Sequence, residues 1–335
     1  MNSFSLGDLA QSFMLQRRGA ALKADMNRAS DELVTGRISD IKSVLAGNTS
    51  YLSEIEKDLK TLEGYGVSTT EAAQFTDAAQ FALERVGITV ESLSAMHLAL
   101  APNALGPVLD QFSEDAKAEM SAIVNALNTT AGGRSLFAGR ATDQSALQDA
   151  GTILDGLRAA TVGVTNTADL KQAAQLWFDD PNGFAAVAYN GSDDALAPVR
   201  VGKDETIDFN LTANDQTFQD LLMHISVAVI SKDATFNFGD ADRRELLQET
   251  GQSLFQAQAD LTAVRASVGS SQARIDSVAT RNATEENALL SAKNALLQVD
   301  PYEAATELEA VQFQLQSLYT VTARMSDLSF VNFIR

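Results

Sequence analysis

The sequence predicts a mainly α protein in which long N-terminal and C-terminal helices pair around a small central α+β insertion. Apolar residues recur every three to four positions through most of the first 130 residues and again from about residue 241 onward. By contrast, the clearest alternating segments, which are typical of strands, lie between residues 147 and 240. Aromatic residues make up only 7% of the chain, and this favours thin helical layers over a thick globular core.

The first predicted helix covers residues 1–62. Its apolar residues fall on two companion seven-residue frames, Ile38, Leu45, Leu52, Leu59 and Ile41, Asn48, Ile55, Leu62. A weaker register upstream contains Leu15, Leu22, Met26 and Leu33. Gly36 and Gly47 are weak points, because glycine costs about 1 kcal/mol in a helix interior.

Two further helices are predicted before the insertion. Gly64-Tyr65-Gly66 reads as a turn, and Thr69 or Thr70 offers the start of a helix that ends within residues 103–107. The next helix buries one apolar face and ends at Gly132-Gly133, since glycine is favoured just past a helix end.

The insertion contains a predicted hairpin. Residues 198–201 and 207–211 alternate apolar and polar side chains and are joined by turn residues 202–205. Asn214 or Asp215 is expected to cap a short helix, and Asp240 the long helix that follows.

That long helix has the most regular pattern in the chain, a heptad frame through Leu247, Leu254, Leu261, Val268, Ile275, Asn282, Leu289 and Leu296. Asp300-Pro301 breaks this frame, and a new one follows. Its members are Leu308, Leu315 and Thr322 with Val311, Leu318 and Met325, and apolar residues continue through Leu328, Phe330 and Phe333. We expect the first frame to pack within its own chain. The second has no evident local partner, so we expect another chain to cover it.

These patterns predict five segments: an N-terminal assembly helix (1–45), two parts of a helical rod (46–145 and 241–300), the insertion (146–240) and a C-terminal assembly helix (301–335). The predicted assembly residues are Leu15, Leu22, Met26, Leu33, Leu308, Val311, Leu315, Leu318, Met325, Leu328, Phe330 and Phe333.

Composition excludes several classes of function. The net charge of −19 would repel phosphate backbones, so we expect no nucleic-acid partner. The absence of cysteine excludes disulfides, thiolate nucleophiles and zinc–thiolate sites. No run of about 18 apolar residues occurs, so no membrane span is predicted. The N-terminal residues lack the apolar core of a cleaved secretory signal.

Catalytic patterns are also missing from the sequence. Its two histidines, His97 and His224, stand alone in helical contexts, where a histidine is more often structural than a ligand. Adjacent acidic pairs lie mostly in turns, and Gly239–Asp242 lacks the later glutamate of a calcium loop. We therefore expect no enzyme activity, no catalytic or metal-binding residue and no cofactor.

Three stretches resemble the flagellin superfamily, and in particular its hook–filament junction proteins, the hook-associated protein 3 family. Residues 132–143, GGRSLFAGRATD, resemble a junction-protein motif in which Ser135 stands where tyrosine is usual. Residues 32–38, ELVTGRI, resemble the N-terminal helix of flagellins, although the usual PSDDP run is replaced by residues 39–42. The most specific likeness is at the C-terminal end, in DPYEAATEL (300–308) and ARMSDLSFVNF (323–333).

The resemblance implies a flagellin-like helical rod whose terminal helices pack with neighbouring subunits while the insertion faces outward. It implies a structural subunit of the bacterial flagellum, in a homo-oligomeric ring that joins the hook, through another hook-associated protein, to the flagellin filament. It also implies export without a cleaved signal peptide, an export chaperone bound to the C-terminal helix, and an extracellular location at the hook–filament junction.

Two alternatives stay open at this point. The chain could be a short flagellin that forms the filament itself, and the final Arg335 is compatible with that. It could also be an acidic coiled-coil binding module unrelated to flagella.

Overall fold

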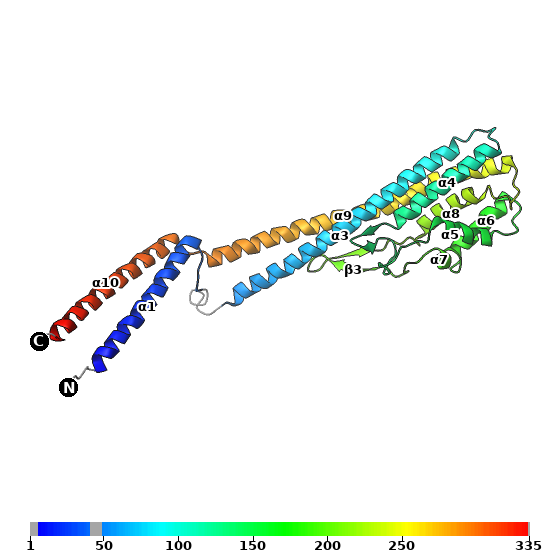
Figure 1. Ribbon diagram of the computed structural model, residues 1–335. Coiled ribbons are helices and arrows are strands. Elements are labelled where there is room, and N and C mark those ends of the chain that lie inside the picture. Colours follow the sequence, from blue (N-terminus) through cyan, green and yellow to red (C-terminus); the bar gives the residue numbers. More distant parts are fainter. Residues whose placement is uncertain (1–5, 41–48, 334–335) are drawn as a thin grey trace. The chain divides into compact units, whose positions relative to one another are not determined.

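The computed structural model describes the chain except residues 1–5, 41–48 and 334–335, with side chains described for residues 10–40 and 49–325 (Figure 1). Helices account for most of the residues that the structure describes, which confirms the predicted mainly α class. The elements are α1 (Leu6–Thr35), α3 (Ser50–Leu98), α4 (Gly106–Leu127), β1 (Thr130–Ala131), β2 (Arg134–Ser135), α5 (Ala150–Ala160), α6 (Thr167–Asp179), α7 (Phe184–Val187), β3 (Leu196–Arg200), β4 (Thr206–Phe209), α8 (Gln216–Ile230), α9 (Asp240–Leu297) and α10 (Pro301–Phe333).

These elements form two compact units. Unit 1 contains Met1–Thr61 and Thr284–Arg335, and unit 2 contains Leu62–Ala283. The five predicted segment boundaries differ from this division and stay a prediction.

In unit 1, α1 and α10 pack side by side in antiparallel directions (Figure 1). The helix predicted for residues 1–62 is interrupted, because α1 ends at Thr35 and Gly36 adopts the left-handed conformation with φ +66°. Its amide donates to the carbonyl oxygen of Glu32 (2.8 Å), which is the hydrogen bond expected of a glycine that terminates a helix. The break predicted at Asp300-Pro301 is confirmed, because α9 ends at Leu297 and α10 begins at Pro301.

The turn predicted at residues 64–66 is wrong, because α3 continues through it. The hydroxyls of Thr69 and Thr70 donate back to the carbonyls of Tyr65 and Gly66 within the helix (2.9 and 2.8 Å) instead of capping a new one. Two glycines weaken a helix by only about 1 kcal/mol each, and the buried Leu62 and Ala72 pack on either side of them.

Unit 2 has one principal apolar core, to which α3 to α9 all contribute (Figure 1). Its largest fully buried side chains include Phe137, Phe184 and Phe218, and the rings of Phe137 and Phe218 meet edge to face, 6.0 Å apart. The elements of the predicted insertion therefore share a core with the long helices.

Helix α4 ends at Leu127, earlier than predicted. Gly132 and Gly133, both at positive φ, form the turn of the short hairpin β1–β2. The LFAG stretch follows, where Gly139 has φ +56°. A Cβ on Gly139 would lie 2.2 Å from the carbonyl oxygen of Ser192, so this position requires glycine.

The predicted hairpin at residues 198–211 is confirmed by the antiparallel pair β3–β4. Its apolar residues Val201 and Ile207 pack with Ala72 of α3 and with Ile275 and Val278 of α9. Asn282, one of the predicted heptad positions, is buried and donates through Nδ2 to the carbonyl oxygen of Val201 (2.9 Å). It therefore anchors the hairpin turn to α9.

The two predicted caps work differently from expectation. Asp215 occupies the N-cap position of α8, as expected, but its carboxylate accepts from the amide of Thr212 (3.0 Å) and makes no capping hydrogen bond to the helix. Asp240 begins α9, and its carboxylate accepts from the amide of Gly106 (3.1 Å), at the start of α4. A negative charge at a helix N-terminus is stabilising, so Asp240 stabilises the N-terminus of α4 instead of capping its own helix.

Candidate assembly surface

The paired helices α1 and α10 hold all of the residues predicted to act in assembly. Along their seam, Leu22 and Ala29 of α1 and Ala304 and Val311 of α10 are buried. Small and branched side chains at this spacing let two helices approach closely but bury little area per turn. The described seam is therefore a thin, two-helix layer.

Three contacts set the alignment of the pair. The guanidinium of Arg28 donates to the carboxylate of Glu307 (2.7 Å). A Cβ on Gly19 would lie 3.5 Å from a methyl group of Leu318, and Gln11 lies against the sulfur of Met325 (3.9 Å). The Arg28–Glu307 pair is partly exposed, so its contribution to stability is about 0–1 kcal/mol. It indicates the alignment of the helices more than it stabilises them.

Two backbone hydrogen bonds join the chain segments at one end of the α1–α10 pair. The amide of Ile38 donates to the carbonyl oxygen of Leu297 (2.9 Å), and the amide of Val299 donates to that of Gly36 (3.1 Å). The carboxylate of Glu32 accepts from the amide of Ser39 (2.8 Å) and so holds the same segment. The break after α1 and the break between α9 and α10 therefore lie side by side, and these hydrogen bonds join them.

The structure places many of the predicted assembly residues in this seam. Leu22 and Val311 are buried, and six more are partly buried, namely Leu15, Met26, Leu308, Leu315, Leu318 and Met325. Leu33 is exposed. The side chains of Leu328, Phe330 and Phe333 lie outside the described residues. The expectation that the C-terminal frame has no partner within the chain is therefore wrong for its described part, because α1 covers it.

A second set of apolar residues on these helices was missed by the sequence pattern. Phe13 (66% exposed) and Val34 (82%) on α1, and Tyr302 (82%) and Phe313 (72%) on α10, face away from the seam. They lie off the heptad frames, so periodicity gives no signal for them. Exposed aromatic side chains are enriched where proteins bind one another, and each of these lies on a helix that is already half covered.

Both histidines lie in unit 2. His97 is fully buried, and neither ring nitrogen has a hydrogen-bond partner. Burial lowers the pKa of His97 to about 4, and backbone groups of Leu247 and Phe112, which approach without bonding geometry, offset only part of this effect. Burial also lowers the pKa of the partly buried His224. Both rings are therefore neutral at pH 7.

Among the residues that the structure describes, no three His, Asp or Glu side chains gather in a way that could hold a metal ion. Across the same residues, no helix combines the length and apolarity of a membrane span.

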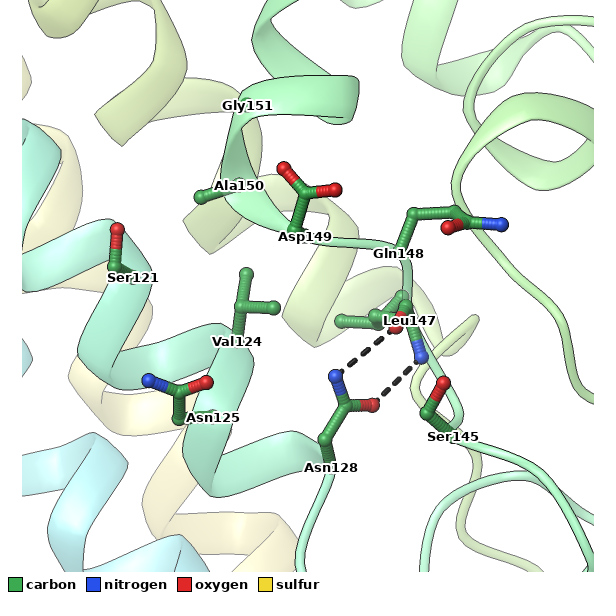
Figure 2. A pocket seen from close by; sticks show the side chains of 10 residues that line it. All are labelled: Ser121, Val124, Asn125, Asn128, Ser145, Leu147, Gln148, Asp149, Ala150 and Gly151. Atoms are coloured by element: carbon green, nitrogen blue, oxygen red, sulfur yellow. Dashed lines mark hydrogen bonds between the residues drawn. The ribbon is translucent and has the colours of Figure 1, made fainter.

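A polar pocket of about 360 Å³ lies between α4 and the start of α5 (Figure 2). Asn128 at its edge exchanges two hydrogen bonds with the backbone of Leu147 (2.8 and 3.0 Å). Asp149 caps α5, and the hydroxyl and amide of Thr152 hold the pKa of its carboxyl below the usual value. These polar groups are thus engaged in holding the fold, and we assign no ligand to the pocket.

Comparison with known proteins gives two kinds of likeness. Residues 250–334 match the family model for the bacterial flagellin C-terminal helical region, a segment that contains the C-terminal motifs of the sequence analysis. No match was found among curated proteins.

Among solved structures, the chain is similar to a putative flagellar hook-associated protein from Vibrio parahaemolyticus, with 14% identity and a TM-score of 0.55 over 74% of this chain and 96% of the other. It also aligns with FlgL from Bacillus cereus, with 12% identity and a TM-score of 0.38 over 84% and 99% of the two chains. The family match is thus confined to the C-terminal segment, and the likeness to the Vibrio parahaemolyticus structure is one of fold.

Proposed function

We propose that this chain is a structural subunit of the bacterial flagellum that joins the hook to the flagellin filament. The observation that carries the proposal is the α1–α10 pair, which leaves apolar side chains such as Phe13 and Phe313 exposed on its outer sides. Of the two helices, α10 lies within the flagellin-like C-terminal match. Isolated two-helix layers bury too little apolar surface to be stable.

Assembly supplies the missing layer. Packing the outer sides of the pair against neighbouring subunits removes their aromatic rings from water, which is worth about 25 cal/mol per Å² of apolar area. Repeated contacts between unlike faces build rings or helical arrays, whereas a self-complementary face would close a dimer. The proposed state is a homo-oligomeric ring between another hook-associated protein and flagellin.

The C-terminal assembly helix is also proposed to bind an export chaperone before secretion. The C-terminal assembly helix would then be covered by the chaperone inside the cell and by sister subunits outside it. In this proposal the chain reaches its extracellular location at the junction without a cleaved signal peptide.

Deletion of the gene distinguishes the junction role from that of a short flagellin. If the chain is a junction protein, cells without it complete their hooks and release flagellin into the medium. If it is a flagellin, the major filament protein itself disappears. Attached filaments in normal number would contradict both roles.

Truncation tests the assembly helix separately. Deleting residues 308–335 is expected to leave unit 2 folded, as judged by circular dichroism, and to abolish attachment of filaments in the deletion strain. Because α1 loses its partner in this variant, point substitutions on the outer sides are the cleaner test, and they are described in the Discussion.

A further inference from the structure

Charge is separated along the α1–α10 pair. Residues 10–24 and 312–325 together contain four cations and no acidic residue, namely Arg17, Arg18, Lys23 and Arg324. We call this the cationic half. Residues 25–35 and 301–311 contain six acidic residues and one cation, namely Asp25, Asp31, Glu32, Glu303, Glu307, Glu309 and Arg28. We call this the acidic half.

The antiparallel alignment brings like charges together. Because Gln11 lies beside Met325 and Arg28 beside Glu307, the cations of α1 share one half of the pair with Arg324. The acidic residues of both helices share the other half. Within residues 10–35 and 301–325, pairing α1 with α10 therefore places like charges side by side in each half.

Ion pairing within the described part of the chain confirms this imbalance. Arg28 binds both Asp25 (3.7 Å) and Glu307 (2.7 Å), and it is the only cation of the acidic half. Within the described residues, Glu303 and Glu309 have no ion-pair partner, and neither do Arg17, Arg18 and Arg324.

These unpaired charges border the exposed aromatic residues. Arg17 lies one helical turn from Phe13, and Glu309 lies one turn from Phe313. All four side chains are exposed. Each helix thus presents an outer strip in which an aromatic ring adjoins a charge that has no ion-pair partner among the described residues. This charge is cationic on α1 and acidic on α10.

We propose that neighbouring copies of this chain pack with an axial offset, the cationic α1 strip of one copy against the acidic α10 strip of the next. The partner is a second copy because the chain itself carries both complementary strips, on different helices of one pair. Packing without an offset would place cationic half beside cationic half, and like charges across an interface are strongly unfavourable. Bringing Arg17 level with Glu309 needs a displacement of about ten residues, or about 15 Å at 1.5 Å per residue. With this displacement at each contact, the proposed ring is one turn of a helical array and not a flat, closed ring.

This inference rests on the proposed function, and charge reversal in the full-length chain tests it directly. One variant carries Arg17→Glu and Arg18→Glu, and the other carries Glu303→Lys and Glu309→Lys. Self-association is measured by sedimentation velocity at about 0.05 M and about 0.5 M salt. Alone, each variant is expected to associate at least about tenfold more weakly than the original chain at low salt.

The two variants mixed in equal amounts are expected to associate again, because each then meets a neighbour of opposite charge. A matched control, Arg85→Glu with Arg134→Glu, reverses two exposed cations of unit 2 and is expected to behave as the original chain. Circular dichroism checks that every variant stays folded.

Several outcomes would overturn the offset. The first is that the original chain does not self-associate at all in the sedimentation experiment, and the second is that each variant alone associates as strongly as the original chain. The third outcome is a mixture of the two variants that associates no more strongly than either variant alone. If the gene deletion detaches filaments while the charge variants still restore them, the proposed function stands and only the offset fails.

Discussion

His97 provides a sharp test of the helical core of unit 2. The ring is fully buried where α3 meets α4 and α9, near Phe112, Leu247 and Gly251. The nearby charge that raises its pKa is that of Asp115 on α4, and it does not outweigh burial, which lowers the pKa to about 4. The folded state therefore binds a proton at His97 more weakly than the unfolded chain does.

The sign and size of the pH effect follow from this difference. Between pH 6.5 and 4 the unfolded chain binds more protons at this position, so the stabilisation by the neutral ring is complete above pH 6.5 and is lost as the pH falls. A tenfold difference in proton affinity is worth about 1.4 kcal/mol, so the drop from 6.5 to about 4 corresponds to about 3 kcal/mol. Below pH 4 the loss is complete.

The substitution His97→Leu removes this titration and two unpaired buried nitrogens. We expect the variant to equal or exceed the original chain in stability at pH 7, and to exceed it by about 3 kcal/mol more at pH 4 than at pH 7. Urea unfolding at a series of pH values measures this difference. His224→Gln is the control, and its smaller effect reflects a partly exposed ring.

An independent readout is available because the chain has only two histidines. In a proton NMR titration, the His97 ring is expected to stay neutral down to about pH 5. A His97 ring that titrates near pH 6.5, or a pH dependence of stability that His97→Leu leaves unchanged, would refute this account of the core.

Two further substitutions test helix contacts. Gly251→Ala would place a Cβ 3.1 Å from the backbone nitrogen of Leu98 and is expected to destabilise the chain by about 1–3 kcal/mol. The matched control Gly269→Ala has open space around it and should stabilise α9 by about 0.5–1 kcal/mol. Equal melting temperatures for the two variants would contradict the close contact between Gly251 and Leu98. Asn282→Ala leaves the buried carbonyl of Val201 unpaired and should lower the free energy of unfolding by about 1–3 kcal/mol. Amide hydrogen exchange should become faster in the β3–β4 hairpin than elsewhere in the chain. A uniform change in exchange would contradict the anchoring role of Asn282.

The long-range helical pattern could be predicted from the sequence, because helix faces repeat every few residues. The frame from Leu247 onward proved to be the face that α9 buries, and the break at Asp300-Pro301 proved to separate two helices. Local signals were less reliable. Gly64 and Gly66 read as a turn, yet packing on either side carries α3 through them.

The remaining differences depend on contacts between distant segments. Asn282 looks like a polar residue on a coiled-coil seam, and only the fold shows that it binds Val201, some 80 residues earlier. The outward rings of Phe13 and Phe313 lie off the heptad frames, so their exposure could be recognised only once α1 was seen to cover the frame of α10.

The central claim is that the outer sides of α1 and α10 join copies of this chain to their neighbours in the flagellum. Its most direct test is filament attachment in a gene-deletion strain that expresses Phe13→Ser with Phe313→Ser. Val162→Ser with Leu176→Ser, which alters two similarly exposed apolar residues of unit 2, is the matched control. The account predicts detached filaments for the first variant and attached filaments for the second, with both proteins folded and exported. Attached filaments in both strains, or loss in the control alone, would contradict it.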